Sequence, residues 1–151
     1  MRRSGTANIC FISEIYSAFE NDKTIIPRIS QITQKTNQFN LTTKRYCEED
    51  ISLFINSPDY NVFSFSMSDR LGDNGTVGLS IVKVNGDVAE IDSFLMSCRV
   101  IQRTAERNFL ALILNYLRGR GIKIVNSTFS PTKKNAISKD FYKNYGFSIL
   151  D

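Results

Sequence analysis

The chain has 151 residues, of which 42% are hydrophobic and 23% charged, and its formal net charge is +4. These values predict one globular domain, and the lack of a long apolar run or secretion signal predicts a cytoplasmic protein without membrane association. The sequence has no histidine and only three widely spaced cysteines, which argues against histidine-based catalysis, a zinc site, any other metal centre and a disulfide framework.

The first half of the chain begins with elements of helical character. Pro27, followed by Ile29 and Ile32 at helical spacing, predicts an amphipathic helix over 27–38. A second helix is expected from Glu48, because its first turn is acidic, until the Ser57-Pro58-Asp59 stop. A first strand is expected near 9–16 or 23–26. We expect residues 1–22 to be an N-terminal extension or linker remnant, and residues 23–151 to form the domain.

A period of two then predicts three antiparallel strands. Apolar residues alternate over 63–67 and again over 77–81, on either side of a Gly72–Gly75 turn. Asn85-Gly86 is a strong hairpin signal, because both residues tolerate the positive φ of a type I′ turn, and it leads into a strand over 87–98.

The last third alternates between helix and strand. Residues 104–118 predict a largely buried helix, 122–129 a strand, Thr132 to about Tyr145 a helix ended by Gly146, and 147–150 a final strand. The order predicts an α/β (α+β) fold with a mixed, mostly antiparallel sheet flanked by helices. The junction between the strand 87–98 and the next helix is where we expect a site.

Several strings give this pattern a family resemblance. Ser97-Cys98-Arg99-Val100, Pro131-Thr132-Lys133-Lys134-Asn135-Ala136 and Phe141-Tyr142-Lys143-Asn144-Tyr145-Gly146-Phe147 resemble the GNAT (Gcn5-related N-acetyltransferase) superfamily. The segment 27–43, with its Gln34-Lys35-Thr36-Asn37-Gln38-Phe39-Asn40 string, and the segment 69–75 resemble the C-terminal half of FkbH-like proteins.

The resemblance implies a biochemical context. FkbH-like proteins join a haloacid-dehalogenase-type phosphatase domain to a GNAT-like domain, and load a glyceryl or related acyl unit onto an acyl carrier protein in polyketide-type biosynthesis. The DxD motif of the phosphatase domain does not occur here. The chain resembles the second domain alone, for which coenzyme A, an acyl-CoA or phosphopantetheine would be the acyl carrier.

The loop before the helix 104–118 is the predicted carrier-binding element. Phosphates bind well where free N–H groups and the helix dipole meet at a helix N-terminus. The GNAT pattern Gln/Arg-x-x-Gly-x-Gly/Ala maps onto Arg99–Thr104, with Gln102 and Thr104 replacing both small residues. Alternatively, the loop is an ordinary connection in which Thr104 caps the helix. The predicted contacts are Cys98, Arg99, Val100, Gln102, Arg103, Thr104 and Ala105.

Catalytic roles are predicted for two residues from the resemblance and the local chemistry. Tyr142 matches the GNAT position that protonates the leaving thiolate, or else it is only a core aromatic residue. Cys98 lies beside Arg99 and a helix N-terminus, so it is a candidate acyl acceptor, or else a buried hydrophobic residue. Asn135 is a candidate contact to the carrier arm, or a first-turn hydrogen-bonding residue.

Asp92 is a candidate base, because parity places it on the same strand face as Cys98. An extended strand of six residues separates them by about 20 Å unless a bulge intervenes. Asp92 and Cys98 are therefore not expected to act on the same atom, and Asp92 is otherwise a solvated strand residue.

Charge predicts the partners. Residues 99–151 contain ten Lys and Arg against three Asp and Glu, so this half attracts phosphates or an acidic carrier protein. Nucleic acid is disfavoured because no nucleic-acid-binding module accompanies the charge. Two functions stay open: a GNAT-type acyltransferase, and a degenerate GNAT fold acting as a carrier-binding or regulatory module. An open sheet edge near the C-terminus would favour a homodimer. The basic cluster comprises Arg118, Arg120, Lys123, Lys133, Lys134, Lys139 and Lys143.

Overall fold

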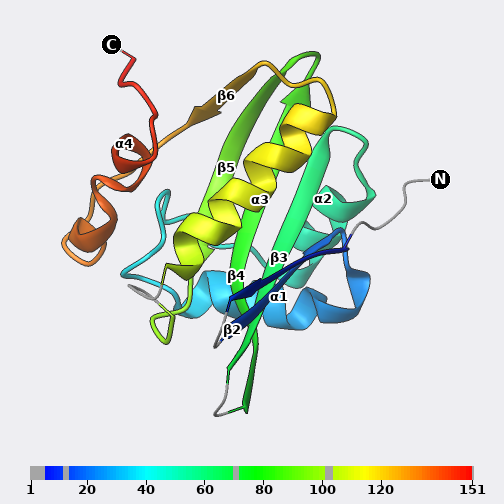
Figure 1. Cartoon of the computed structure of the whole chain (residues 1–151). Helices are drawn as coiled ribbons and strands as arrows, with labels where there is room; N and C mark the ends of the chain where they lie inside the picture. The colour runs from blue at the N-terminus through cyan, green and yellow to red at the C-terminus, as the bar shows by residue number, and fades with distance from the viewer. Residues whose placement is uncertain (1–5, 12–13, 70–71, 101–103, 151) are drawn as a thin grey trace.

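A computed structural model describes residues 6–11, 14–69, 72–100 and 104–150. Within them, six strands form one sheet in chain order, and only the last pair, β5 and β6, is parallel. The prediction of a mixed, mostly antiparallel sheet flanked by helices is confirmed (Figure 1). The strands are β1 Thr6–Phe11, β2 Glu14–Glu20, β3 Tyr60–Asp69, β4 Gly72–Asn85, β5 Val88–Met96 and β6 Ile124–Ser127.

The segment 1–22, set apart in the sequence analysis as an extension, contributes strands β1 and β2. β2 pairs with β3 along its full length, from Glu14 opposite Asp69 to Glu20 opposite Phe63. The end of β2 is fixed by a buried carboxylate, because Glu20 accepts a hydrogen bond from the Asn61 amide. This segment is therefore continuous with the sheet of the domain.

Helices α1 (Ile26–Lys35) and α2 (Glu48–Asn56) cover one face of the sheet, as predicted. Pro27 lies in the first turn of α1, and Cys47 and Asp50 form a capping box at the start of α2. The apolar faces of both helices pack on the sheet in one core cluster. This cluster comprises Ile29, Ile32, Ile51, Ile55, Val62, Leu79, Ile81 and Leu95.

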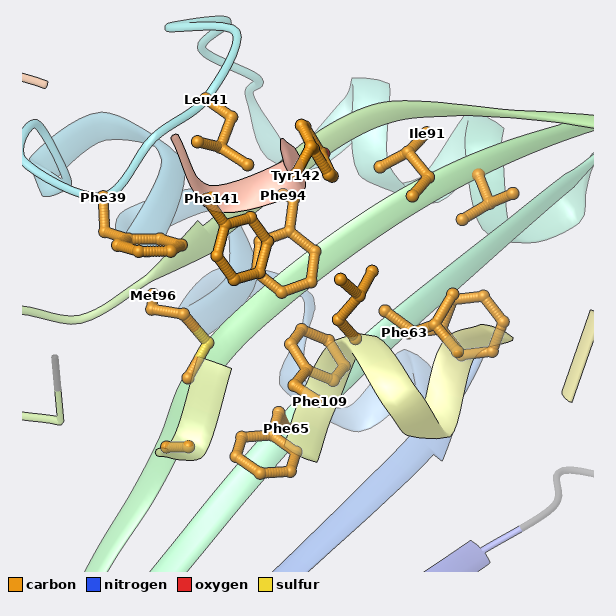
Figure 2. Close-up of a cluster of buried hydrophobic side chains, with 14 of the residues drawn as sticks. Phe39, Leu41, Phe63, Phe65, Ile91, Phe94, Met96, Phe109, Phe141 and Tyr142 are labelled. Atoms are coloured by element: carbon orange, nitrogen blue, oxygen red, sulfur yellow. The ribbon is translucent and has the colours of Figure 1, made fainter. Parts of the chain in front are cut away.

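Helix α3 (Ala105–Gly119) covers the opposite face, over a core rich in aromatic rings (Figure 2). The rings of Phe65 and Phe109 stack with centroids 4.8 Å apart, and Phe94 lies 5.2 Å from Phe109. Gly78 makes this close approach of helix to sheet possible. A Cβ there would lie 2.5 Å from Met96 Sδ and 3.3 Å from Phe109 Cδ1.

The C-terminal region departs from the prediction. In place of one helix from Thr132 to Tyr145, the chain forms a 3-10 turn, Ala136–Ser138, and a short helix, α4 (Phe141–Asn144). Side chains compete with the backbone here, because Asn135 Oδ1 accepts from the Thr132 N–H at 2.7 Å and Thr132 Oγ1 from that of Asn135 at 3.2 Å. The strand predicted at 147–150 is also absent from the described structure, and β6 is shorter than 122–129.

Candidate functional site

A pocket opens where β5 ends, at the strand-to-helix junction that the sequence singles out. Its volume is about 520 Å³. One wall is the outer face of α1 and the segment after it, and the other is the chain leaving β5. The lining residues are Arg28, Gln31, Ile32, Lys35, Thr36, Asn37, Gln38, Phe39, Met96, Ser97, Cys98 and Arg99.

Cys98 is an exposed free thiol in this pocket, which rules out the alternative of a buried hydrophobic residue. The pocket lining includes three cations, Arg28, Lys35 and Arg99, and no described carboxylate. The Arg28 guanidinium is held in place, because it donates to Gln31 Oε1 at 2.6 Å and to the Thr76 carbonyl at 3.2 Å. The thiol therefore shares its pocket with three cationic side chains.

The loop that follows contains a strained residue. Thr104, the residue immediately before α3, has φ +62°, although a β-branched residue avoids this left-handed conformation. Its side chain makes no cap hydrogen bond, so the predicted capping role is wrong. Val100 and Ala105 are fully buried and could contact a ligand only through backbone atoms. Gln102 and Arg103 lie outside the described residues.

The outer edge of β5 is covered by the chain itself. β5 pairs with β6 only from Val88 to Ile91. Beyond that point the segment 39–42 takes the edge: Leu41 N–H donates to Phe94 O at 3.2 Å, and Met96 N–H donates to Phe39 O at 3.0 Å. We call residues 39–42 the edge segment. Phe39 and Leu41 point into the aromatic core beside Phe94 (Figure 2).

Asn135 holds the edge segment in place. Its side-chain amide is fully buried, and its Nδ2 donates to the Asn40 carbonyl at 3.0 Å and to the Ser130 carbonyl at 2.9 Å. The Ser130 N–H in turn donates to Leu41 O at 2.7 Å. The structure therefore gives Asn135 a structural role, and a contact to a carrier arm would require these bonds to break.

Asp92 lies in a β-bulge and is surrounded by partners. Ile81 pairs with Ser93 and Val82 with Ile91, so Asp92 is the extra residue of β5. Its carboxylate accepts from Lys44 Nζ and Tyr46 Oη, both at 2.6 Å, and from Ser93 Oγ at 2.9 Å.

These contacts set the charge of Asp92. Burial raises its pKa, but the bonds from Lys44, Tyr46 and Ser93 outweigh burial and bring the pKa below its usual value. Ile91 and Phe94 face the same core although they are three residues apart, which regular alternation along a strand does not allow. The bulge at Asp92 therefore breaks the alternation by which Asp92 was placed on the same face as Cys98. In the described structure Asp92 links β5 to the segment after α1, and its role as a base stays a prediction.

Tyr142 is a core residue with a buried hydroxyl. Its side chain is 8% exposed, its ring packs 5.3 Å from that of Phe141 and 5.0 Å from that of Phe147, and its Oη has no partner in the described part of the chain. Burial raises the pKa of this phenol far above its ordinary value. A role as general acid would require the ring to gain access to a substrate.

No protein-family model and no curated protein matches this sequence, whereas solved structures match it closely in shape. Ard1 from Thermoplasma volcanium gives a TM-score of 0.69 at 17% identity, over 90% of this chain and 84% of that one. The ribosomal-protein-S18-alanine N-acetyltransferase from Escherichia coli gives 0.66 at 16% identity, over 90% and 79%. Aminoglycoside N-acetyltransferase AAC(6')-Iy in complex with CoA gives 0.66 at 12% identity, over 100% and 94%. The chain has the GNAT fold.

Within this GNAT fold the predicted basic cluster divides in two. Arg118 lies in the last turn of α3, and Arg120 and Lys123 lie in the turn between α3 and β6, where Lys123 pairs with Asp87 at 3.5 Å. The others lie between β6 and the C-terminus, around α4, at the opposite end of β6 (Figure 1). The seven exposed cations are therefore two separate groups.

The α1 wall of the pocket is not predicted from the sequence. Arg28, Gln31 and Lys35 follow helical spacing on the face next to Ile29 and Ile32, and Ile32 also lines the pocket. This spacing is also the pattern of an ordinary solvated helix face. In the described chain no helix is long and apolar enough to cross a membrane, and no group of three metal-binding side chains occurs.

Proposed function

We propose that this chain is an acyltransferase in which Cys98 accepts the acyl group from a carrier thioester. The observation that carries the proposal is the exposed Cys98 thiol in a pocket of about 520 Å³ beside Arg28, Lys35 and Arg99. The GNAT fold is shared with acetyltransferases, one of them in complex with CoA, which supports the thioester chemistry.

The proposed reaction is a thiol–thioester exchange. The Cys98 thiolate attacks the acyl carbonyl carbon, the bond from that carbon to the carrier sulfur breaks, and the carrier leaves as a thiolate that takes up a proton from solvent or an acid. Positive charge in the pocket would stabilise the oxyanion of the tetrahedral intermediate. A second exchange would pass the acyl group to the acceptor.

The carrier fits the site only in part. Coenzyme A and phosphopantetheine have an extended arm with two amides, which would pair well with a free strand edge. The edge of β5 next to the pocket is taken by Phe39 and Leu41. The arm must therefore enter along the pocket itself, with the start of α3 as the candidate site for its phosphate.

The biosynthetic context comes from the sequence resemblance. We propose that the acyl carrier is the phosphopantetheine of an acyl carrier protein, as in FkbH-like systems, with a separate phosphatase domain as partner. The basic residues around α4, Lys133, Lys134, Lys139 and Lys143, are exposed and would attract an acidic carrier protein.

Intact-protein mass spectrometry tests this function. Incubation with acetyl-CoA, or with an acylated carrier protein, should add one acyl group to the wild type and none to Cys98→Ser. Cys47→Ser is the matched control, since Cys47 is the other exposed free thiol of the described chain, and it should still be acylated. Equal labelling of Cys98→Ser and the wild type would contradict the proposal.

A second candidate is a non-catalytic carrier-binding module, favoured by the covered β5 edge and the buried hydroxyl of Tyr142. Thermal shift separates the two functions. Stabilisation by a phosphopantetheinylated carrier protein, without acylation of Cys98, would support the module. Stabilisation by neither coenzyme A nor the carrier would leave the acyltransferase without a substrate.

We also propose a homodimer through β6. This strand is the last of the described sheet, and Ile124 on it is 54% exposed. Pairing of two β6 edges would cover it. Solution scattering should give twice the mass of the chain, and a monomer at high concentration would refute the dimer.

A further inference from the structure

The pocket beside Cys98 carries a net positive charge that the described protein does not neutralise. Arg28, Lys35 and Arg99 line it, and no described carboxylate pairs with any of them. The remaining polar lining consists of amides and hydroxyls, which donate hydrogen bonds readily to oxygen. A neutral or cationic ligand would leave three positive charges uncompensated in one cavity.

The α1 helix does not cancel this charge. Its C-terminal end, at Lys35, lies at the pocket and contributes roughly half a negative charge, against three full positive charges. Arg28 is already oriented by its bonds to Gln31 and Thr76, so it would lose little side-chain entropy on binding an anion.

We infer that this pocket binds an anionic group on the acyl chain itself, a carboxylate or phosphate within a few bonds of the thioester carbon. The inference rests on the proposed acyl transfer and narrows its substrate class, since a glyceryl group is uncharged. The cations share one cavity with the thiol, whereas the carrier's phosphate lies a full pantetheine arm away from the sulfur. An anion near the reacting carbon therefore fits the cavity better than the carrier's own phosphate.

Competing alkylation of the cysteines tests the anion site without a substrate. Iodoacetate and iodoacetamide attack the same thiolate but differ in charge, so the ratio of their rates at one cysteine does not depend on the pKa of that thiol. Cys47 is an exposed thiol of opposite surroundings in the same chain, because its Sγ donates to the carboxylate of Asp50 at 3.1 Å, which repels iodoacetate. The decisive comparison is therefore between Cys98 in the wild type and Cys98 in the charge-removal variants below. We expect the iodoacetate/iodoacetamide ratio at Cys98 to exceed that at Cys47 by about tenfold at low salt.

Charge removal should lower the ratio at Cys98 alone. Lys35→Gln is the principal variant, because Lys35 is exposed and its loss should not affect folding, and Arg28→Gln is the second. Each should reduce the ratio at Cys98 about threefold or more and leave Cys47 unchanged. Lys23→Gln removes an exposed cation outside the pocket and should have no effect. Equal ratios at Cys98 and Cys47, or an unchanged ratio in Lys35→Gln, would overturn the inference.

Competitors identify the source of the anion. Inorganic phosphate should slow the iodoacetate reaction at Cys98 in the wild type and much less in Lys35→Gln. Protection by adenosine 3′,5′-bisphosphate, the nucleotide end of coenzyme A, without protection by inorganic phosphate would assign the cations to the carrier and overturn the inference. If Cys98 shows the anion preference but is never acylated, the acyltransferase proposal fails and the anion site stands.

Discussion

Two tyrosines allow one chemical change to be tested in opposite environments. Tyr46 Oη donates to Asp92 Oδ2 at 2.6 Å, whereas Tyr142 Oη is buried and makes no hydrogen bond in the described chain. Replacing either residue by phenylalanine removes one oxygen and keeps the ring. We predict that Tyr46→Phe destabilises the protein and that Tyr142→Phe stabilises it.

The magnitudes follow from the two environments. A hydrogen bond to a charged group contributes about 1.5–3 kcal/mol, and Asp92 keeps Lys44 and Ser93 as partners, so Tyr46→Phe should cost about 1.5 kcal/mol. An unsatisfied buried hydroxyl costs roughly 1–3 kcal/mol, so Tyr142→Phe should gain about 1 kcal/mol. Urea denaturation at neutral pH measures both changes, provided that the m value stays constant.

The sign of the stability change in Tyr142→Phe is the critical test. A loss of stability of 1 kcal/mol or more in Tyr142→Phe would mean that the hydroxyl has a partner in solution, such as a buried water. The description of the Tyr142 hydroxyl as unpartnered would then be wrong, and Tyr142 would have to be considered again as a general acid. Tyr46→Phe serves as the control that the assay detects the loss of one hydroxyl.

Three further variants test other parts of the structure. Thr104→Gly should stabilise the chain by about 0.5–1 kcal/mol in urea denaturation, because relief of roughly 1–2 kcal/mol of left-handed backbone strain exceeds the entropy cost of glycine. Thr36→Gly is the control and should destabilise the chain, because Thr36 has an ordinary φ of −87°. Because the pKa of Asp92 is lower in the folded chain, its stabilisation is present above the unfolded value near about 3.9 and is lost as pH falls through the folded value; acid titration of Asp92→Asn should therefore show a smaller loss than the wild type below about pH 4. Gly78→Ala should lower the free energy of unfolding by about 1–3 kcal/mol, because its methyl group would overlap the Met96 side chain, and a neutral result would mean that the flexible Met96 side chain moves aside.

The sequence predicts the elements whose periodicity is local and strong. The apolar faces of α1 and α3, and the alternation in β3 and β4, follow directly from side-chain spacing, and these elements are present. The helix predicted at 132–145 fails for a reason that spacing does not contain. The Asn135 side chain instead makes a long-range hydrogen bond to the carbonyl of Asn40, 95 residues away, and the chain around it is not helical.

The sequence predicts where along the chain the pocket lies, but only some of the residues that line it. Cys98 and Arg99 follow from the strand-to-helix junction, because that junction is local in sequence. Arg28 and Lys35 reach the same pocket from a helix more than 60 residues earlier, and only the tertiary fold brings them there. The strand face predicted for Asp92 is wrong, because a single bulge residue reverses the strand parity on which its placement depended.

The string from Gln34 to Asn40 has two structural roles. Its first part, with Lys35, Asn37 and Gln38, lines the pocket, and its end, with Phe39 and Asn40, runs along the edge of β5. One segment thus forms the pocket wall and also covers the strand edge that an extended arm would use. A substitution at Phe39 should therefore alter access to Cys98 as well as core packing, so the pocket and the edge segment should be tested as a unit.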